Sequence, residues 1–245
     1  MSYFNIIKLD ATPSSNDWLK AQMMKGSCAD RDLVWVKNQT HGRGQMNKKW
    51  ESEEGKSLTF SLFKVFPDLT AQNFFLINCA VSLAIVSAVN ELTQLNLKVK
   101  WPNDILSGRK KIAGILIENM LKGSRIKGSV IGVGINVNQN SFDGLPFASS
   151  LSLVLDKDMD MTKLLEVILK HLQTGLDRLS DDDAFDLIRK YEDLLFRKDV
   201  LSTFKDNTGQ FSGIIQGVTA GGLLKVARPS GKLTHYSTGN LEFIL

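Results

Sequence analysis

The sequence predicts an α/β protein in which a larger domain of mixed strands and helices precedes a small all-β domain. Apolar patterns of strand length and helix length alternate up to about residue 196. Beyond Arg197, short β-prone runs are separated by turn clusters rich in Gly, Asn, Ser and Pro. We therefore expect a boundary near residue 197, between a domain of residues 1–197 and one of residues 198–245.

Periodicity locates the elements of the larger domain. Strands are expected where apolar and polar residues alternate or short apolar runs occur, at residues 5–9, 33–37, 57–65, 97–101, 111–118 and 126–138. Helices are expected at residues 15–24, 71–92, 162–179 and 183–196. Ser14 or Ser15 is the predicted N-cap of the first helix, and the second is predicted to be long and amphipathic.

The last part of the chain differs in that turn clusters interrupt it at short intervals. Turn clusters divide it at residues 206–209, 220–222, 229–231 and 237–240. These turns imply about five short strands, an arrangement that is typical of a small barrel.

Composition and charge exclude several classes of protein. With 43% hydrophobic and 23% charged residues, the chain is typical of a soluble globular protein. Its net charge of +4 comes from scattered cations, which argues against nucleic acid and fits an anionic small molecule. The N-terminus lacks a signal-peptide pattern, and the apolar stretch 74–89 is short and interrupted for a membrane span. Because Cys28, Cys79 and the three histidines show no metal or redox spacing, we expect a cytoplasmic protein without a protein-held metal.

Residues 40–50 carry the most informative pattern. Gly42 and Gly44 flank Arg43, and two lysines and Trp50 follow. The glycines allow the backbone to fold tightly over a ligand, and the cations suit a carboxylate or a phosphate. Alone, such a pattern is more often a solvated loop, so its interpretation depends on the other segments.

The predicted strand 126–138 has two different faces. Its odd positions are aliphatic, whereas its even positions include Gly132, Gly134 and Asn136. Because glycine weakens a strand, several glycines on one face indicate close approach by another group. That group is either another backbone or a ligand ring, with Asn136 as a polar contact.

Lys111 opens the neighbouring strand. If the two strands form a hairpin with its turn near residues 122–123, Lys111 lies opposite Gly134 and over the bare face, with Ala113 opposite Gly132. A slip of one residue would turn Lys111 to the other side. The alternative interpretation is a solvated lysine at a strand end.

Two polar clusters also have two interpretations each. Asn103 and Asp104 either form a simple turn after Pro102 or place an amide and a carboxylate beside a nucleotide. Residues 14–16 either cap a helix or, together with Gln39, hydrogen-bond a neutral group such as a urea.

In this order, segments 40–50, 100–104, 111–118 and 132–136 resemble the catalytic domain of biotin protein ligases, over roughly residues 10–140. The resemblance implies a mixed-sheet domain similar to that of class II aminoacyl-tRNA synthetases, followed by an SH3-like β-barrel. It also implies activation of biotin with ATP and Mg²⁺ to biotinyl-5′-adenylate. The biotinyl group would then pass to a lysine of the biotin carboxyl carrier domain of a carboxylase.

The resemblance implies a role for each matching residue. Arg43 and Lys111 would be catalytic, and Trp50 and Trp101 are landmarks near the site. Implied contacts with biotin come from Ser14, Ser15, Asn16, Gln39, Arg43, Gly44, Gln45 and Lys111. Implied contacts with ATP or the adenylate come from Arg43, Trp50, Asn103, Asp104, Lys111 and Asn136.

Two features depart from the bifunctional biotin repressors. These carry a winged-helix domain before the Ser/Thr-Asn motif, which begins here at residue 14, so we expect a monofunctional ligase without DNA binding. Gln45 stands where the bacterial repressor has arginine, which bears on how tightly the loop retains the adenylate.

Two other functions stay open. A lipoate-type protein ligase is built on a related domain but accepts a longer acid without a ureido group. A non-catalytic biotin or adenylate sensor would need neither Arg43 nor Lys111 to offset phosphate charge. Homodimerisation and the role of the small barrel also stay open, and no membrane partner is expected.

Overall fold

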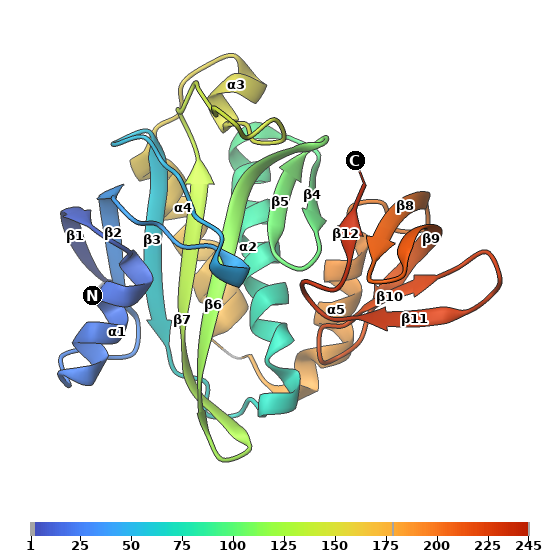
Figure 1. Cartoon of the computed structure of the whole chain (residues 1–245). Helices are drawn as coiled ribbons and strands as arrows, with labels where there is room; N and C mark the ends of the chain where they lie inside the picture. Colours follow the sequence, from blue (N-terminus) through green and yellow to red (C-terminus); the bar gives the residue numbers. More distant parts are fainter. Residues whose placement is uncertain (1–2, 178, 245) are drawn as a thin grey trace.

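A seven-stranded mixed sheet forms the larger part of the protein, which a computed structural model describes over residues 3–177 and 179–244 (Figure 1). The strand order is β1-β2-β3-β7-β6-β5-β4. β1 and β2 pair in parallel, and the other neighbouring strands pair antiparallel. The strands are β1 (Asn5–Thr12), β2 (Asp32–Gln39), β3 (Ser57–Lys64), β4 (Leu97–Lys100), β5 (Asp104–Ser107), β6 (Lys110–Lys122) and β7 (Arg125–Asn136).

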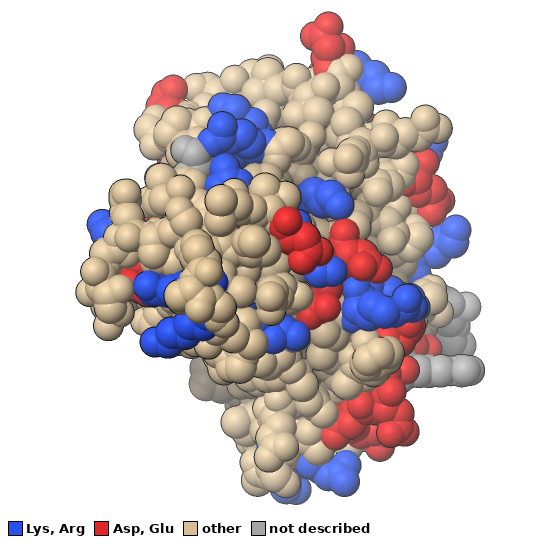
Figure 2. All heavy atoms as spheres, turned by 90° about the vertical axis from the view of Figure 1, so that its right-hand side faces the viewer, with Lys and Arg blue, Asp and Glu red and all other residues tan. Residues whose placement is uncertain are grey.

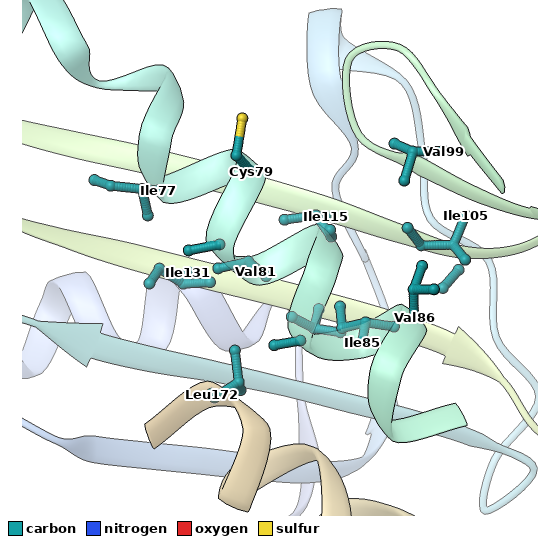
Figure 3. Close-up of a cluster of buried hydrophobic side chains, with 14 of the residues drawn as sticks. Ile77, Cys79, Val81, Ile85, Val86, Val99, Ile105, Ile115, Ile131 and Leu172 are labelled. Atoms are coloured by element: carbon teal, nitrogen blue, oxygen red, sulfur yellow. The ribbon is translucent and has the colours of Figure 1, made fainter. Parts of the chain in front are cut away.

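Helices cover the central part of one face of this sheet. α2 (Phe75–Thr93) lies on the sheet and is itself covered by α4 (Met161–Leu176) and α5 (Ala184–Asp193). Figure 3 shows side chains of α2 between Ile115 and Ile131 of the sheet and Leu172 of α4. The prediction of an amphipathic second helix is wrong, because this sandwiched position buries apolar residues around nearly the whole of α2. The helix is apolar and long enough to cross a membrane, but 72% of its most apolar window is buried in this core.

The other face of the sheet is only partly covered. α1 (Ser15–Met24) packs there through Leu19 against Val34, Val36 and Val130. Ser14 is the N-cap of this helix, and its side chain accepts a 3.4 Å hydrogen bond from the backbone N–H of Asp17. Because α1 covers only β2, β3 and part of β7, the same face remains open beside β6.

A five-stranded antiparallel sheet follows, in the order β11-β10-β9-β8-β12. It joins the larger sheet through Trp101, whose Nε1 donates a 2.9 Å hydrogen bond to the Gly222 carbonyl. The backbone N–H of Val218 likewise donates to Glu192 at 2.7 Å. Buried residues of both sheets form one hydrophobic cluster, and the domain boundary near residue 197 stays a proposal. The strands are β8 (Leu201–Asp206), β9 (Gly209–Val218), β10 (Leu224–Ala227), β11 (Leu233–Tyr236) and β12 (Glu242–Phe243).

The fold class predicted from the sequence is confirmed, and each predicted strand and helix of the larger domain has a counterpart within a few residues. Among the strands and α-helices of the larger domain, β5 and α3 (Leu151–Leu155) were not predicted. Both are four or five residues long, too short to show a periodic pattern.

Charges of both signs share the surface. On the side of the molecule that carries the smaller sheet, Figure 2 shows Lys and Arg side chains interspersed with Asp and Glu. This face therefore presents no single field of one sign, in agreement with the scattered cations of the sequence.

The buried hydroxyl of Tyr191 in α5 supports the turn that carries Asn103 and Asp104. It donates a 2.8 Å hydrogen bond to the Pro102 carbonyl. We expect Tyr191→Phe to lower the free energy of unfolding by about 0.5–1.5 kcal/mol, because one buried hydrogen bond is lost without a cavity. Urea denaturation would measure this loss.

Phe185→Ala is the matched control, because this side chain of the same helix is 83% exposed. We expect a change within about 0.5 kcal/mol for the control. Equal stability of wild type and Tyr191→Phe would contradict the supporting role of the hydroxyl.

Candidate functional site

A cavity of about 910 Å³ lies on the open face of the larger sheet. It is bounded by the start of α1, the loop of residues 42–50 (below, the glycine loop) and residues 238–244 at the end of the chain. Every residue for which the sequence predicted a role lines this one cavity. These residues are Ser14, Ser15, Asn16, Gln39, Arg43, Gly44, Gln45, Trp50, Asn103, Asp104, Lys111 and Asn136.

Uncharged polar groups form one end of the cavity. Ser15 donates to Gln39 Oε1 from both its backbone N–H, at 2.7 Å, and its hydroxyl, at 2.8 Å. The Ser61 hydroxyl of β3 has one proton to share between Asn16 Oδ1, at 2.5 Å, and Ser15 Oγ, at 2.7 Å. Asn16 Nδ2 then donates to Glu118 at 2.8 Å. This chain of hydrogen bonds fixes the amide and hydroxyl orientations before any ligand arrives.

The bare face of β7 is covered by side chains of the site. A Cβ on Gly132 would overlap the Asn16 amide, and a Cβ on Gly134 would overlap the Trp50 indole. The sequence left open whether a backbone or a ligand approaches these glycines. In the structure, the nearest groups are the Asn16 amide and the Trp50 indole, and both glycines also line the cavity.

The predicted hairpin register is wrong, although Lys111 does stand over the bare face. Gly114, not Lys111, pairs with Gly134, because the turn lies one residue later than predicted and the register shifts again near Met120. A second shift, at Ile112 in the pairing of β5 with β6, restores the face on which Lys111 lies. Lys111 Nζ would therefore contact a Cβ on Gly114, and it lies 5.6 Å from the centroid of the Trp50 ring.

Asp104 pairs with Lys111 at the end of the cavity that lies opposite the uncharged groups. The Lys111 Nζ to Asp104 Oδ1 distance is 2.6 Å, and the two side chains are 34% and 26% exposed. Asn103 is buried, and its side-chain amide donates to the Ile115 carbonyl. Asp104 thus meets the cavity with its charge balanced by Lys111, whereas Asn103 holds the strand end in place.

Two buried polar atoms of the cavity wall lack a partner within the described residues. They are Trp50 Nε1, a donor, and Asn136 Oδ1, an acceptor. Asn136 Nδ2, by contrast, donates to the Ser149 carbonyl at 2.9 Å. A buried group without a partner costs free energy, so both atoms are suited to hydrogen-bond a bound polar ligand.

Arg43 connects the glycine loop to α1 and β6. Its Nη2 lies 2.7 Å from Asp17 Oδ1 and 3.1 Å from Glu118 Oε2, and Lys20 contacts the same two carboxylates. Burial raises the pKa of Glu118, but hydrogen bonds from Lys20, Asn16 and Arg43 outweigh it and hold this pKa below its ordinary value. The pKa of Asp17 is lowered in the same way, against its burial, by Lys20 and Arg43.

Cations outnumber carboxylates around the cavity. Six Lys or Arg residues line it against three Asp or Glu residues, so the lining carries a net positive charge. Lys100 lies in this group, with Nζ 5.3 Å from the centroid of the Phe243 ring. Burial lowers its pKa, and the nearby cations Lys111 and Lys48 lower it further against the opposing effect of Asp104. The net positive charge of the cavity lining favours an anionic ligand.

Several residues of the site had no assigned role in the sequence. Ser61 on β3 and Glu118 on β6 support Asn16 from the two strands that flank β7, and each is a polar residue in an apolar strand. Lys100 is the first residue of the segment 100–104 that carries the resemblance, but no role was predicted for it. Phe142, Phe147 and residues 238–239 and 241–244 also line the cavity. Most of them lie in irregular segments, whose path the sequence does not predict. Within residues 3–177 and 179–244, no group of three His, Cys, Asp or Glu side chains is arranged to hold a metal ion.

Comparison with known proteins identifies relatives of this arrangement. The biotin/lipoate A/B protein ligase family matches residues 9–136. The bifunctional ligase/repressor BirA of Bacillus spizizenii is 33% identical over 64% of the chain, and the match covers 49% of that protein. The biotin–[acetyl-CoA-carboxylase] ligase of Mycobacterium tuberculosis is 28% identical over 67% of the chain and 61% of its own length. The chain thus spans about half to three fifths of these curated relatives.

Solved structures share the whole fold. The biotin protein ligase of Aquifex aeolicus, in complex with biotin and ATP, matches with a TM-score of 0.80 and 24% identity over 98% of this chain and 99% of that one. The biotin protein ligase of Leishmania major, in complex with biotinyl-5-AMP, matches with a TM-score of 0.65 and 22% identity over 96% and 99%. These similarities establish that both sheets have the same arrangement in all three proteins.

The lowered pKa of Glu118 predicts a pH-dependent stability contribution. The folded state binds this proton less readily than the unfolded chain, so the carboxylate stabilises the fold above the ordinary value of 4.5. This contribution is lost as the pH falls through the lower folded value. We therefore expect wild type to exceed Glu118→Gln in stability near pH 7, with the difference shrinking near pH 3, in urea denaturation.

Glu166→Gln, an exposed position of α4, is the control. It should leave the stability unchanged at both pH values. A difference between wild type and Glu118→Gln that is equally large near pH 3 would contradict a role for the charge.

Proposed function

Because this chain belongs to the biotin/lipoate A/B protein ligase family, we propose that it is a biotin protein ligase. In the first step, the biotin carboxylate attacks the α-phosphate of ATP, and pyrophosphate leaves to give biotinyl-5′-AMP. In the second step, a lysine amine of a carrier attacks the acyl carbon, and AMP leaves. The proposed carrier is the biotin carboxyl carrier domain of a carboxylase, and Mg²⁺ arrives with ATP as part of the substrate.

One observation carries this proposal. Residues from separate segments line a single cavity, with uncharged hydrogen-bonding groups at one end and cations at the other. Biotin has the same polarity, because its ureido ring is neutral and its valerate tail ends in a carboxylate. The nucleotide would then lie beyond the carboxylate, near Lys111, Trp50 and Asn136.

The uncharged end favours biotin over lipoate. A ureido group needs both donors and acceptors, whereas the dithiolane ring of lipoate is apolar. Gln39 Oε1 is fully used by Ser15, and its amide nitrogen makes no hydrogen bond to a described residue. This nitrogen would serve as a donor to the ureido oxygen. An apolar ring would instead leave this amide nitrogen without a hydrogen-bond partner.

The cations offset the main electrostatic cost of the first step. A carboxylate about 4 Å from a phosphate oxygen costs about 4 kcal/mol at an effective dielectric constant near 20. Arg43 and Lys111 would reduce this repulsion and stabilise the charge of the pentacovalent transition state. The glycine loop, which carries Arg43 and Trp50, would shield the reactive adenylate from water. No covalent intermediate with the protein is needed.

The relatives support the same assignment. The Aquifex aeolicus ligase binds biotin and ATP, and the Leishmania major ligase binds biotinyl-5-AMP. The Mycobacterium tuberculosis relative is a ligase for acetyl-CoA carboxylase, which suggests a carboxylase as the source of the carrier. We propose a cytoplasmic location, because both Cys28 and Cys79 are free thiols.

Exchange of labelled pyrophosphate into ATP tests the proposal directly. We expect exchange that depends on biotin and is absent with lipoate, because only the ureido ring matches the polar end of the cavity. Exchange with lipoate alone would move the protein to the lipoate branch of its family. No exchange with either acid, from a folded protein that binds biotin, would indicate a sensor instead of an enzyme.

Lys111→Ala should reduce biotin-dependent exchange by about 10²-fold or more, because a cation facing the transition-state charge is lost. Lys110→Ala is the control, since the neighbouring side chain is exposed and does not line the cavity. Circular dichroism and thermal unfolding would establish that both variants are folded. Near-normal exchange by Lys111→Ala would refute the role given to this lysine.

A further inference from the structure

The glycine loop is built as one unit. The Gly44 N–H donates to the Lys48 carbonyl at 2.7 Å, and the Trp50 N–H donates to the Gly42 carbonyl at 2.9 Å. Arg43 and Lys49 form an antiparallel bridge between these two bonds. A segment with these internal bonds opens or closes as a whole, so a contact that holds Arg43 restrains the entire loop.

Two carboxylates outside the cavity hold Arg43. Asp17 lies in the first turn of α1 and Glu118 lies on β6, and both contact Arg43 Nη2, at 2.7 Å and 3.1 Å. Neither carboxylate lines the cavity. Asp17 and Glu118 therefore reach a bound ligand only through Arg43 and Asn16.

The contacts leave Arg43 free to act on a ligand as well. They all use Nη2, and Nε and Nη1 donate no hydrogen bond to a residue in the described ranges 3–177 and 179–244. A guanidinium carries five N–H donors in a fixed plane. One edge can therefore stay on the two carboxylates while the other meets a carboxylate or phosphate of the ligand.

Building on the proposed function, we propose that Asp17 and Glu118 are positioning residues that form a carboxylate clamp on Arg43 and slow the escape of biotinyl-5′-AMP. The clamp keeps the glycine loop closed over the adenylate and leaves Nε and Nη1 of Arg43 free to hydrogen-bond the ligand. Gln45, in the middle of the glycine loop, is uncharged, whereas an arginine there would carry another positive charge. The clamp therefore holds the loop through Arg43.

Lys20 makes a discriminating control possible. It contacts the same carboxylates as Arg43, at 2.9 Å to Asp17 and 2.8 Å to Glu118, but it forms no hydrogen bond or ion pair with a described side chain of the loop. Removing Lys20 weakens the local charge network while freeing both carboxylates for Arg43. A purely structural role of the cluster would make all its variants similar, whereas the clamp predicts opposite effects.

The experiment compares wild type with Asp17→Asn, Glu118→Gln, the double variant and Lys20→Gln. Each protein is loaded with labelled biotinyl-5′-AMP and chased with excess unlabelled adenylate. We expect release to be about two- to fivefold faster for each single clamp variant, as for a partly exposed ion pair, and faster still for the double variant. Lys20→Gln should release the adenylate at the wild-type rate or more slowly.

Thermal unfolding of each variant separates changes in adenylate release from changes in protein stability. This is needed because the Asp17 carboxylate also stabilises the N-terminus of α1. Glu118→Gln retains an acceptor for the Asn16 amide, so the biotin end of the cavity stays ordered in that variant. Wild-type release rates in the double variant would overturn the clamp, as would faster release by Lys20→Gln. Failure of the wild-type protein to bind the adenylate at all would instead overturn the proposed function on which the clamp rests.

Discussion

The unequal covering of the two sheet faces is the constraint on which the site depends. α2, α4 and α5 bury the central part of one face, and the functional groups gather on the other face. There the glycines of β7 remove side-chain bulk where Asn16 and Trp50 must lie flat on the strand. An alanine at Gly132 or Gly134 would push one of these side chains into the cavity. The bare face of β7 thus determines the depth of the cavity and the orientation of its walls.

The charged groups around the site are arranged as pairs of a cation with one or two carboxylates. Each cation with a proposed catalytic role already has a carboxylate partner, which is Asp104 for Lys111 and Asp17 with Glu118 for Arg43. These pairs are partly exposed, so each contributes little to stability. Their effect is on position, because an ion pair limits the rotamers of a long, flexible side chain before the substrate binds. Preorganisation of this kind lowers the cost of binding and of the reaction.

Sequence patterns predicted the parts of the site that depend on local geometry. The alternation of β7 assigned its aliphatic and glycine-bearing faces, and the cap at Ser14 located the start of α1. The predicted register of Lys111 is wrong because the turn lies one residue later than predicted and the strand irregularity near Met120 leaves no mark in the pattern. The roles of Ser61 and Glu118 depend on contacts with Asn16 across 45 and 102 positions of the sequence. Pairings over such distances follow from the assembled sheet and not from any local pattern.

The smaller sheet has a part in the site that its sequence left open. Its last segment, residues 238–244, lines the cavity, and the Phe243 ring lies beneath the Lys100 ammonium group. The Trp101 indole bonds to the Gly222 carbonyl, so the strand end that precedes Asn103 and Asp104 is fastened to this sheet. The cationic end of the cavity is therefore built between the two sheets. Separation of the small sheet from the larger one would remove a wall of the cavity as well as buried apolar surface.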